Sequence, residues 1–85
     1  MLIEVCGPGC ARCQMTGKNV RQVVKELGME NEAQVIDIKD IKEISARGVL
    51  VTPAVFIDGV KVCQGRIPST QEVRKMIEER ASTRN

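Results

Sequence analysis

The feature that most constrains this chain is the segment of residues 6–13, with the sequence CGPGCARC. It holds three of the four cysteines and lies between a short apolar run and a long amphipathic pattern. Cys10 and Cys13 have the Cys-x-x-Cys spacing, so on the first turn of a helix they can form a disulfide with little rearrangement of the chain. The unpaired N–H groups and the macrodipole of a helix N-terminus also stabilise a thiolate. This spacing therefore favours a thiol–disulfide redox site.

Length and composition narrow the range of functions. The 85 residues suffice for one small domain, residues 1–85, which we expect to bury roughly 60–65% of its unfolded surface. The net charge of +2 is too balanced to favour nucleic acid or an anionic membrane as a partner. Phe56 is the single aromatic residue, which excludes base-stacking platforms. The absence of histidine excludes Cys–His nucleophiles and His-containing zinc sites.

The start of the chain shows no targeting pattern. Residues 1–5 (MLIEV) contain neither a basic region nor an apolar run of signal-peptide length. No stretch reaches the ~20 apolar residues that a membrane span needs. We therefore expect a cytoplasmic protein that does not enter a membrane. In that compartment, four cysteines indicate metal binding or redox catalysis more often than a framework of structural disulfides.

The first half of the chain alternates between strand and helix patterns. Residues 2–5 form an apolar run bounded by glycine and proline, as expected of a buried strand. Apolar residues then recur on one helical face over residues 11–27, and Gly28 suits the position after the end of that helix. Gly17 inside the helix predicts close packing against the sheet. Residues 33–38 predict a second strand.

The second half continues this alternation and adds a hairpin. Asp40 and Glu43 form a predicted capping box for a short helix. Residues 54–63 contain two apolar runs joined by Asp-Gly, the strongest short-range sequence signal for a tight β-hairpin. Residues 69–72 (STQE) form a second capping box that opens the last helix. The order β-α-β-α-β-β-α predicts an α/β fold with a four-stranded mixed sheet and helices on both faces.

This pattern resembles the thioredoxin fold, in which a Cys-x-x-Cys loop joins a strand to a helix and a Thr-Pro precedes a hairpin. The sequence is similar to the small, glutaredoxin-sized "redox-active disulfide" proteins of archaea and bacteria in the thioredoxin superfamily. The resemblance covers nearly the whole chain, and its most specific parts are residues 9–15 (GCARCQM), 52–54 (TPA) and 65–69 (GRIPS). The chain departs from the usual thioredoxin pattern at Gly9, where a tryptophan is common, and at residues 11–12 (AR), where Gly-Pro is common.

The resemblance implies a role for each motif. It makes Cys10 the exposed nucleophile and Cys13 the buried thiol that resolves the mixed disulfide. Pro53 corresponds to a cis-proline facing the two sulfurs, and Thr52 to a residue whose backbone meets a substrate peptide. Arg12 adds a positive charge within the motif, and we expect it to help lower the Cys10 pKa. The implied partners are protein disulfides and a thioredoxin-reductase-like electron donor. We expect a monomer without a cofactor, because the two sulfurs carry the electrons.

Two alternatives remain open from the sequence. Cys6, Cys10 and Cys13, alone or with Cys63, could supply thiolates to zinc or to an iron–sulfur cluster. A glutathione-dependent glutaredoxin is the third hypothesis, although only Gly65 stands where glutaredoxins carry a Gly-Gly-x-Asp-like segment. For Cys6 and Cys63 we favour a role as buried packing residues, because free cysteine is commonly buried. The alternative for Cys6 is a third redox thiol that exchanges with Cys10.

Overall fold

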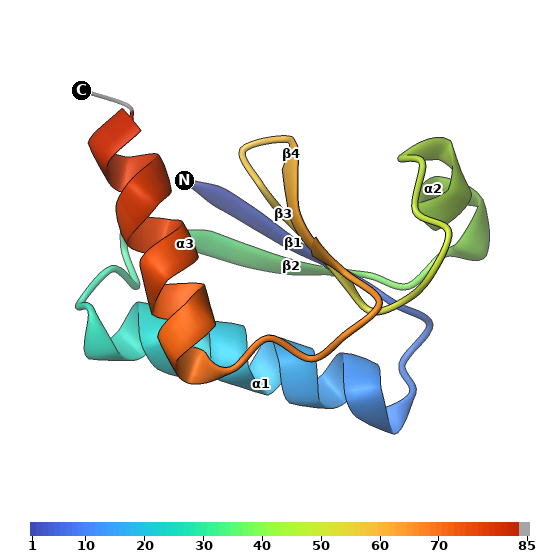
Figure 1. The fold of residues 1–85 in the computed structure, drawn as a ribbon, viewed down its shortest axis with the longest axis horizontal. Helices are drawn as coiled ribbons and strands as arrows, with labels where there is room; N and C mark the ends of the chain where they lie inside the picture. Colours follow the sequence, from blue (N-terminus) through green and yellow to red (C-terminus); the bar gives the residue numbers. More distant parts are fainter. Residues whose placement is uncertain (84–85) are drawn as a thin grey trace.

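The computed structural model describes residues 1–83 and has the element order β-α-β-α-β-β-α (Figure 1). The strands are β1 (Leu2–Cys6), β2 (Gln34–Ile38), β3 (Ala54–Ile57) and β4 (Val60–Gln64). The helices are α1 (Ala11–Glu26), α2 (Ile41–Ala46) and α3 (Thr70–Thr83). The predicted fold class and order of elements are confirmed, with ends close to those expected from the sequence. Within residues 1–83, none of the helices combines the length and apolar character needed to cross a bilayer.

The four strands form one mixed sheet in the order β2-β1-β3-β4. β1 runs parallel to β2 and antiparallel to β3, and β3 forms an antiparallel hairpin with β4. Asp58 and Gly59 both have positive φ angles, 51° and 84°, which is the backbone conformation that a tight Asp-Gly hairpin turn requires. Cys6 pairs with Ala54, so the end of β1 lies beside the beginning of β3. This register brings the cysteine loop next to the Thr-Pro segment.

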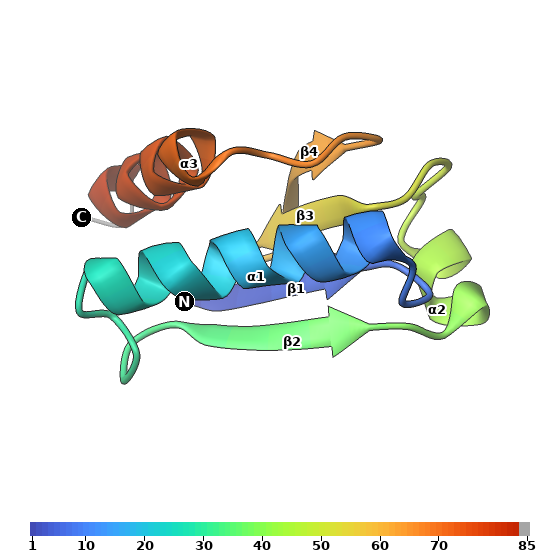
Figure 2. The same ribbon diagram turned by 90° about the horizontal axis from the view of Figure 1, so that it is seen from below.

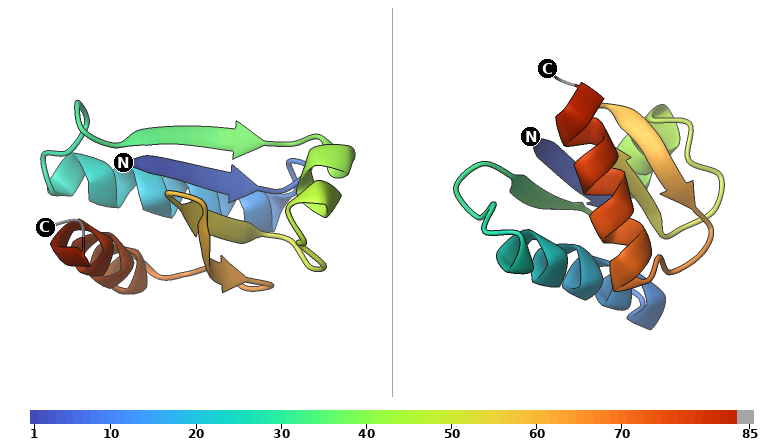
Figure 3. Two further views of the ribbon diagram at one scale, coloured as in Figure 1. Left: turned by 90° about the horizontal axis from the view of Figure 1, so that it is seen from above. Right: turned by 60° about the vertical axis from the view of Figure 1, so that its left-hand side comes forward.

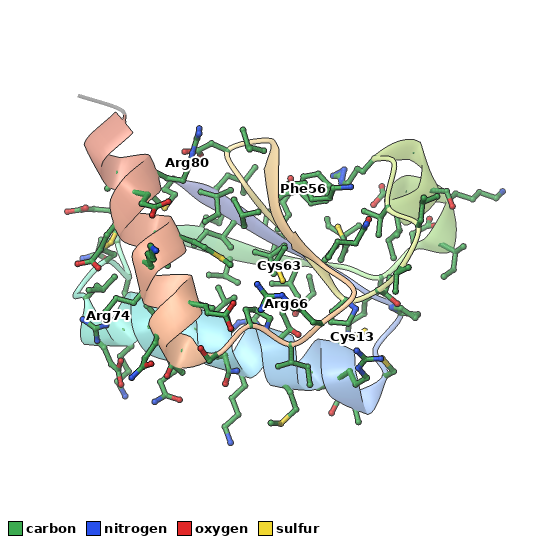
Figure 4. All side chains as sticks on the ribbon, viewed as in Figure 1. Cys13, Phe56, Cys63, Arg66, Arg74 and Arg80 are labelled. Carbon is green, nitrogen blue, oxygen red and sulfur yellow. The ribbon has the colours of Figure 1, made fainter. Side chains whose placement is uncertain are left out.

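Different helices cover the two faces of the sheet. α1 lies along the sheet in front of β1 and β2 in Figure 2, and the views of Figure 3 show α1 and α3 together, with α2 apart at one end. The α1 and α3 face is a core of alternating strand residues and helix residues, including Ile3, Val5, Val55, Ile57, Val20, Val23 and Ile77. On the opposite face Ile44 of α2 packs with Cys6, Ala54 and Phe56 (Figure 4).

Capping interactions determine where the helices begin and end. Ser69 Oγ accepts a hydrogen bond from the Glu72 N–H, and the Glu72 carboxylate accepts one from the Ser69 N–H, so the predicted capping box of α3 is confirmed. Asp40 caps α2 by accepting from the Lys42 N–H. The predicted second half of that box is wrong, because the Glu43 side chain makes no hydrogen bond within residues 1–83. The start of α2 therefore has a single N-cap, Asp40.

Candidate active site

The Cys10–Cys13 pair lies where α1 begins. Cys10 is the N-cap residue, with an extended backbone, and its side chain is exposed. Cys13 lies on the first turn of α1 and is only 6% exposed (Figure 4). The two sulfurs are 2.9 Å apart, and both residues are free thiols. The helix start therefore holds one accessible and one covered sulfur within contact distance of each other.

The two thiols differ in acidity. The hydrogen bond with Cys13 is the largest influence on Cys10 and lowers its pKa, and backbone N–H groups of the first turn act in the same direction. Burial raises the pKa of Cys13, and its hydrogen bond to the Cys10 sulfur raises it further. Cys10 is therefore the member of the pair that ionises more easily. Disulfide exchange uses such a pair, in which an exposed sulfur that ionises easily lies next to a buried thiol that ionises less easily.

Gly7 makes room for the Cys13 sulfur. A Cβ atom built on Gly7 would lie 2.2 Å from Cys13 Sγ and 2.8 Å from Cys13 Cβ. The Gly7 N–H donates to the Ile38 carbonyl at 2.9 Å, which ties this residue to the end of β2. In the sequence, Gly7 is recognisable only as part of the loop that ends the first strand. A glycine so close to the cysteine motif suggests a close approach of the backbone, but the contact with Cys13 depends on the fold.

The Thr52-Pro53 segment lies beside the cysteine loop. The peptide bond between Thr52 and Pro53 is cis, and Pro53 is buried. The pairing of Cys6 with Ala54 places Pro53 level with Gly7. In Figures 1 and 2 the loop that precedes β3 lies at the end of the molecule where α1 begins. The structure thus brings together the two motifs that the sequence separates by about forty residues.

Arg12 connects these two motifs. Its Nη2 donates to the Gly65 carbonyl at 3.1 Å, and the Gly65 N–H donates to the Pro53 carbonyl at 2.8 Å. The guanidinium charge also lowers the Cys10 pKa, but it is the smallest of the causes. The sequence indicates only an electrostatic role for Arg12, because the contact with Gly65 depends on how the loop after β4 folds over α1.

The other two cysteines lie away from the pair. Cys6 is fully buried on the α2 face of the sheet, and Cys63 packs on the opposite face, where its thiol donates to the Arg66 carbonyl at 3.6 Å (Figure 4). Burial raises the pKa of both thiols. Within residues 1–83, no three Cys, Asp or Glu side chains are grouped so that they could hold a metal ion. The geometry therefore gives no support to a cluster of Cys6, Cys10 and Cys13.

Comparison with known proteins agrees with this geometry. The family model described as "Thioredoxin domain" matches residues 1–78. The chain belongs to the thioredoxin domain family. It is similar to a thioredoxin of Methanothermobacter thermautotrophicus, with 39% identity over 77 residues that cover 91% of this chain and 97% of that protein. It is also similar to a thioredoxin of Methanocaldococcus jannaschii, with 40% identity over 75 residues that cover 88% of this chain and 84% of that protein.

Membership in this family, together with the adjacent sulfurs, identifies the activity. The chain is a thioredoxin-like thiol–disulfide oxidoreductase, which confirms the predicted function. Thioredoxins generally act on protein disulfides and receive electrons from a reductase.

Proposed function

We propose that this chain transfers electrons to protein disulfides through reversible formation of a Cys10–Cys13 disulfide. One observation carries the proposal: the exposed Cys10 sulfur, with its lowered pKa, lies 2.9 Å from the buried Cys13 sulfur. Exchange requires a thiolate that can reach the substrate and a second thiol that can reach the first. This pair meets both requirements without a cofactor.

Cys10 is the nucleophile in this mechanism. Its thiolate attacks one sulfur of the substrate disulfide, the substrate S–S bond breaks, and the departing substrate thiolate takes up a proton. The product is a mixed disulfide between Cys10 and the substrate. The Cys13 thiol then gives up its proton and attacks Cys10 Sγ, which releases the second substrate thiol and leaves a Cys10–Cys13 disulfide. The short distance between the two sulfurs supports this resolving role for Cys13.

Thr52 and Pro53 form the substrate-binding edge in this proposal. Pro53 lies level with Gly7 in the sheet register, and its carbonyl is held by the Gly65 N–H. Arg12 fixes Gly65 in turn, so the start of α1 and the Thr52-Pro53 segment act as one unit. A substrate peptide that meets the Thr52 backbone is thereby held at the Cys10 sulfur. Arg12 is accordingly a positioning residue as well as a weak electrostatic one.

We also propose the oligomeric state, electron donor and location of the chain. We place residues 1–85 in a single domain that acts as a monomer and accepts electrons from a thioredoxin-reductase-like protein. We also propose a cytoplasmic location, the compartment in which cysteines serve redox chemistry more often than structural disulfides.

A trapping experiment tests the roles of the two cysteines. The Cys13→Ser variant is mixed with insulin whose disulfides are intact. We expect a mixed disulfide between Cys10 and insulin, which dithiothreitol releases. Cys10→Ser is the matched control and is expected to trap no insulin. A Cys13→Ser adduct that forms through Cys6 or Cys63, or no adduct at all, would overturn the proposal. Turnover that depends on glutathione instead of a dithiol donor would favour the glutaredoxin alternative.

A further inference from the structure

A cavity of about 240 Å³ borders Cys13 but not Cys10. It opens between the first half of α1 and the end of β2, and Gly7, Gly9 and Gly17 contribute backbone to its wall. Drug-sized ligands occupy pockets of roughly 300–1,000 Å³, so this cavity suits a molecule of only a few heavy atoms. Cys13 is one of the residues that line it, so a small molecule bound there lies next to the buried member of the pair.

The charge around this cavity is predominantly positive. Lys18, Arg21 and Lys39 line it, against one carboxylate, that of Asp37. Arg21 neutralises Asp37 through an ion pair of 2.9 Å. The ammonium groups of Lys18 and Lys39 make no hydrogen bond or ion pair within residues 1–83. Two uncompensated cations on a chain whose net charge is only +2 favour an anionic ligand at this place.

Gly17 keeps this arrangement open. A Cβ atom at Gly17 would lie 2.9 Å from Arg21 Nη1 and 3.6 Å from Asp37 Oδ1, so the missing side chain gives the Arg21 guanidinium its place beside Asp37. The Arg21–Asp37 pair forms one part of the cavity wall, which Lys18 and Cys13 also line. The close packing that the sequence predicted for Gly17 therefore involves an ion pair at the edge of β2.

We propose that this cavity binds a small anionic thiol that reduces the Cys10–Cys13 disulfide by attacking Cys13. This inference rests on the proposed function, since it adds a second electron donor to the same disulfide. The thiolate of the ligand forms a bond to Cys13 Sγ, the Cys10–Cys13 bond breaks, and Cys10 leaves as a thiolate. A second ligand thiolate then attacks the ligand sulfur of this adduct, and Cys13 leaves and takes a proton from solvent. Two ligand thiols are oxidised to one disulfide while the protein regains its dithiol.

The chemistry of the pair favours attack on Cys13. Thiol–disulfide exchange is faster when the leaving thiol has the lower pKa. Attack on Cys13 expels Cys10, whose pKa is still lowered by the backbone N–H groups of the first turn and by Arg12 after Cys13 has lost its thiol proton. Attack on Cys10 expels Cys13, whose pKa is raised by burial. Cys13 is 6% exposed, so bulky donors are excluded from it, but the cavity admits a small one.

The test uses three thiols of similar size that differ in charge: 3-mercaptopropionate, 2-mercaptoethanol and cysteamine. The rate constant for reduction of the oxidised protein by each thiol is first corrected for the fraction of that thiol that is ionised. It is then divided by the rate constant of the same thiol with a neutral model disulfide. At low ionic strength we expect 3-mercaptopropionate to have the largest ratio and cysteamine the smallest. In the Lys18→Gln/Lys39→Gln variant the ratio for 3-mercaptopropionate should fall by about fivefold per lysine, while that for 2-mercaptoethanol stays unchanged.

The double variant Lys25→Gln/Lys75→Gln is the matched control, because it removes the same charge from exposed positions outside the cavity. It is expected to keep the preference for the anionic thiol. Acid quenching followed by mass mapping should find the ligand on Cys13 in the first adduct. A ligand found on Cys10, or a charge preference that survives in Lys18→Gln/Lys39→Gln, overturns the inference. Insulin trapping through Cys10 is independent of both lysines, so the proposed function would stand in either case.

Discussion

Replacing Gly7 with alanine tests whether the sulfur pair depends on one missing side chain. The added Cβ would lie 2.2 Å from Cys13 Sγ, whereas ordinary van der Waals contact begins near 3.4 Å. The Gly7 backbone cannot easily move away from Cys13, because the Gly7 N–H donates a hydrogen bond to the Ile38 carbonyl at the end of β2. The Cys13 sulfur must therefore move by roughly 1 Å or turn to another rotamer. Because the new Cβ would also lie 2.8 Å from Cys13 Cβ, the start of α1 must shift as well, and these movements disturb the 2.9 Å contact with Cys10.

Two quantities should change in the Gly7→Ala variant. Overpacking of this kind costs about 1–3 kcal/mol in the free energy of unfolding. The Cys10 pKa should also rise toward its ordinary value, because the hydrogen bond with Cys13 is the largest influence that lowers it. At neutral pH the variant should accordingly react more slowly with iodoacetamide than the parent protein does.

Urea unfolding of the reduced protein and the pH profile of Cys10 alkylation measure these two effects. Gly17→Ala is the matched control, because its new Cβ would come close to the flexible tip of Arg21 and lie at ordinary contact distance from Asp37. Alanine also gains roughly 1 kcal/mol of helix propensity over glycine. That control should be as stable as the parent, with the same Cys10 profile. The reasoning is refuted if Gly7→Ala stays within about 0.5 kcal/mol of the parent and keeps its alkylation profile.

Two side-chain contacts and the two buried thiols give three further predictions. Arg12→Gln should leave the Cys10 alkylation profile nearly unchanged, since its charge is the smallest cause of the shift, yet slow insulin reduction by releasing the Gly65 loop; a large pKa change would contradict this. Ser69→Ala should lower stability to urea by about 1 kcal/mol through loss of the α3 cap, and an unchanged midpoint would argue against the capping box.

The third prediction concerns alkaline pH. Burial raises the pKa of Cys6 and Cys63 above the ordinary 9.0, so the unfolded chain loses these protons first. Their contribution to stability is therefore complete below the unfolded pKa and is lost as pH rises through the folded pKa. The urea midpoint of the reduced protein should fall from about pH 8.5 upward, and a Cys6→Ala/Cys63→Ala variant should show a weaker fall.

Local patterns made most of the fold predictable. The Asp58-Gly59 turn, the Ser69–Glu72 capping box and the apolar periodicity of α1 each depend on residues close in sequence, and each was found where it was predicted. The adjacency of Cys10 and Cys13 is local in the same sense, because one helical turn brings them together.

Apart from the nearness of Pro53 to the cysteine loop, which the family resemblance implied, contacts between distant segments were not predictable from the sequence. Arg12 reaches the Gly65 carbonyl across 53 positions, and Arg47 forms an ion pair of 2.7 Å with Glu4 across 43 positions. Cys6 packs under α2 because its side chain lies on that face of β1. The pairing register of the strands determines that face. The cavity beside Cys13 likewise depends on how α1 lies across the end of β2, and neither segment specifies this by itself.

A redox titration with mapping of all four cysteines tests the central claim most directly. The protein is equilibrated across a range of dithiothreitol ratios, quenched with acid, unfolded and alkylated, and each cysteine is quantified by mass spectrometry. We predict that Cys10 and Cys13 become protected together in a single two-electron step, while Cys6 and Cys63 remain alkylatable throughout. Protection of Cys10 paired with Cys6 or Cys63, or a Cys10 that stays alkylatable at every ratio, would contradict the account.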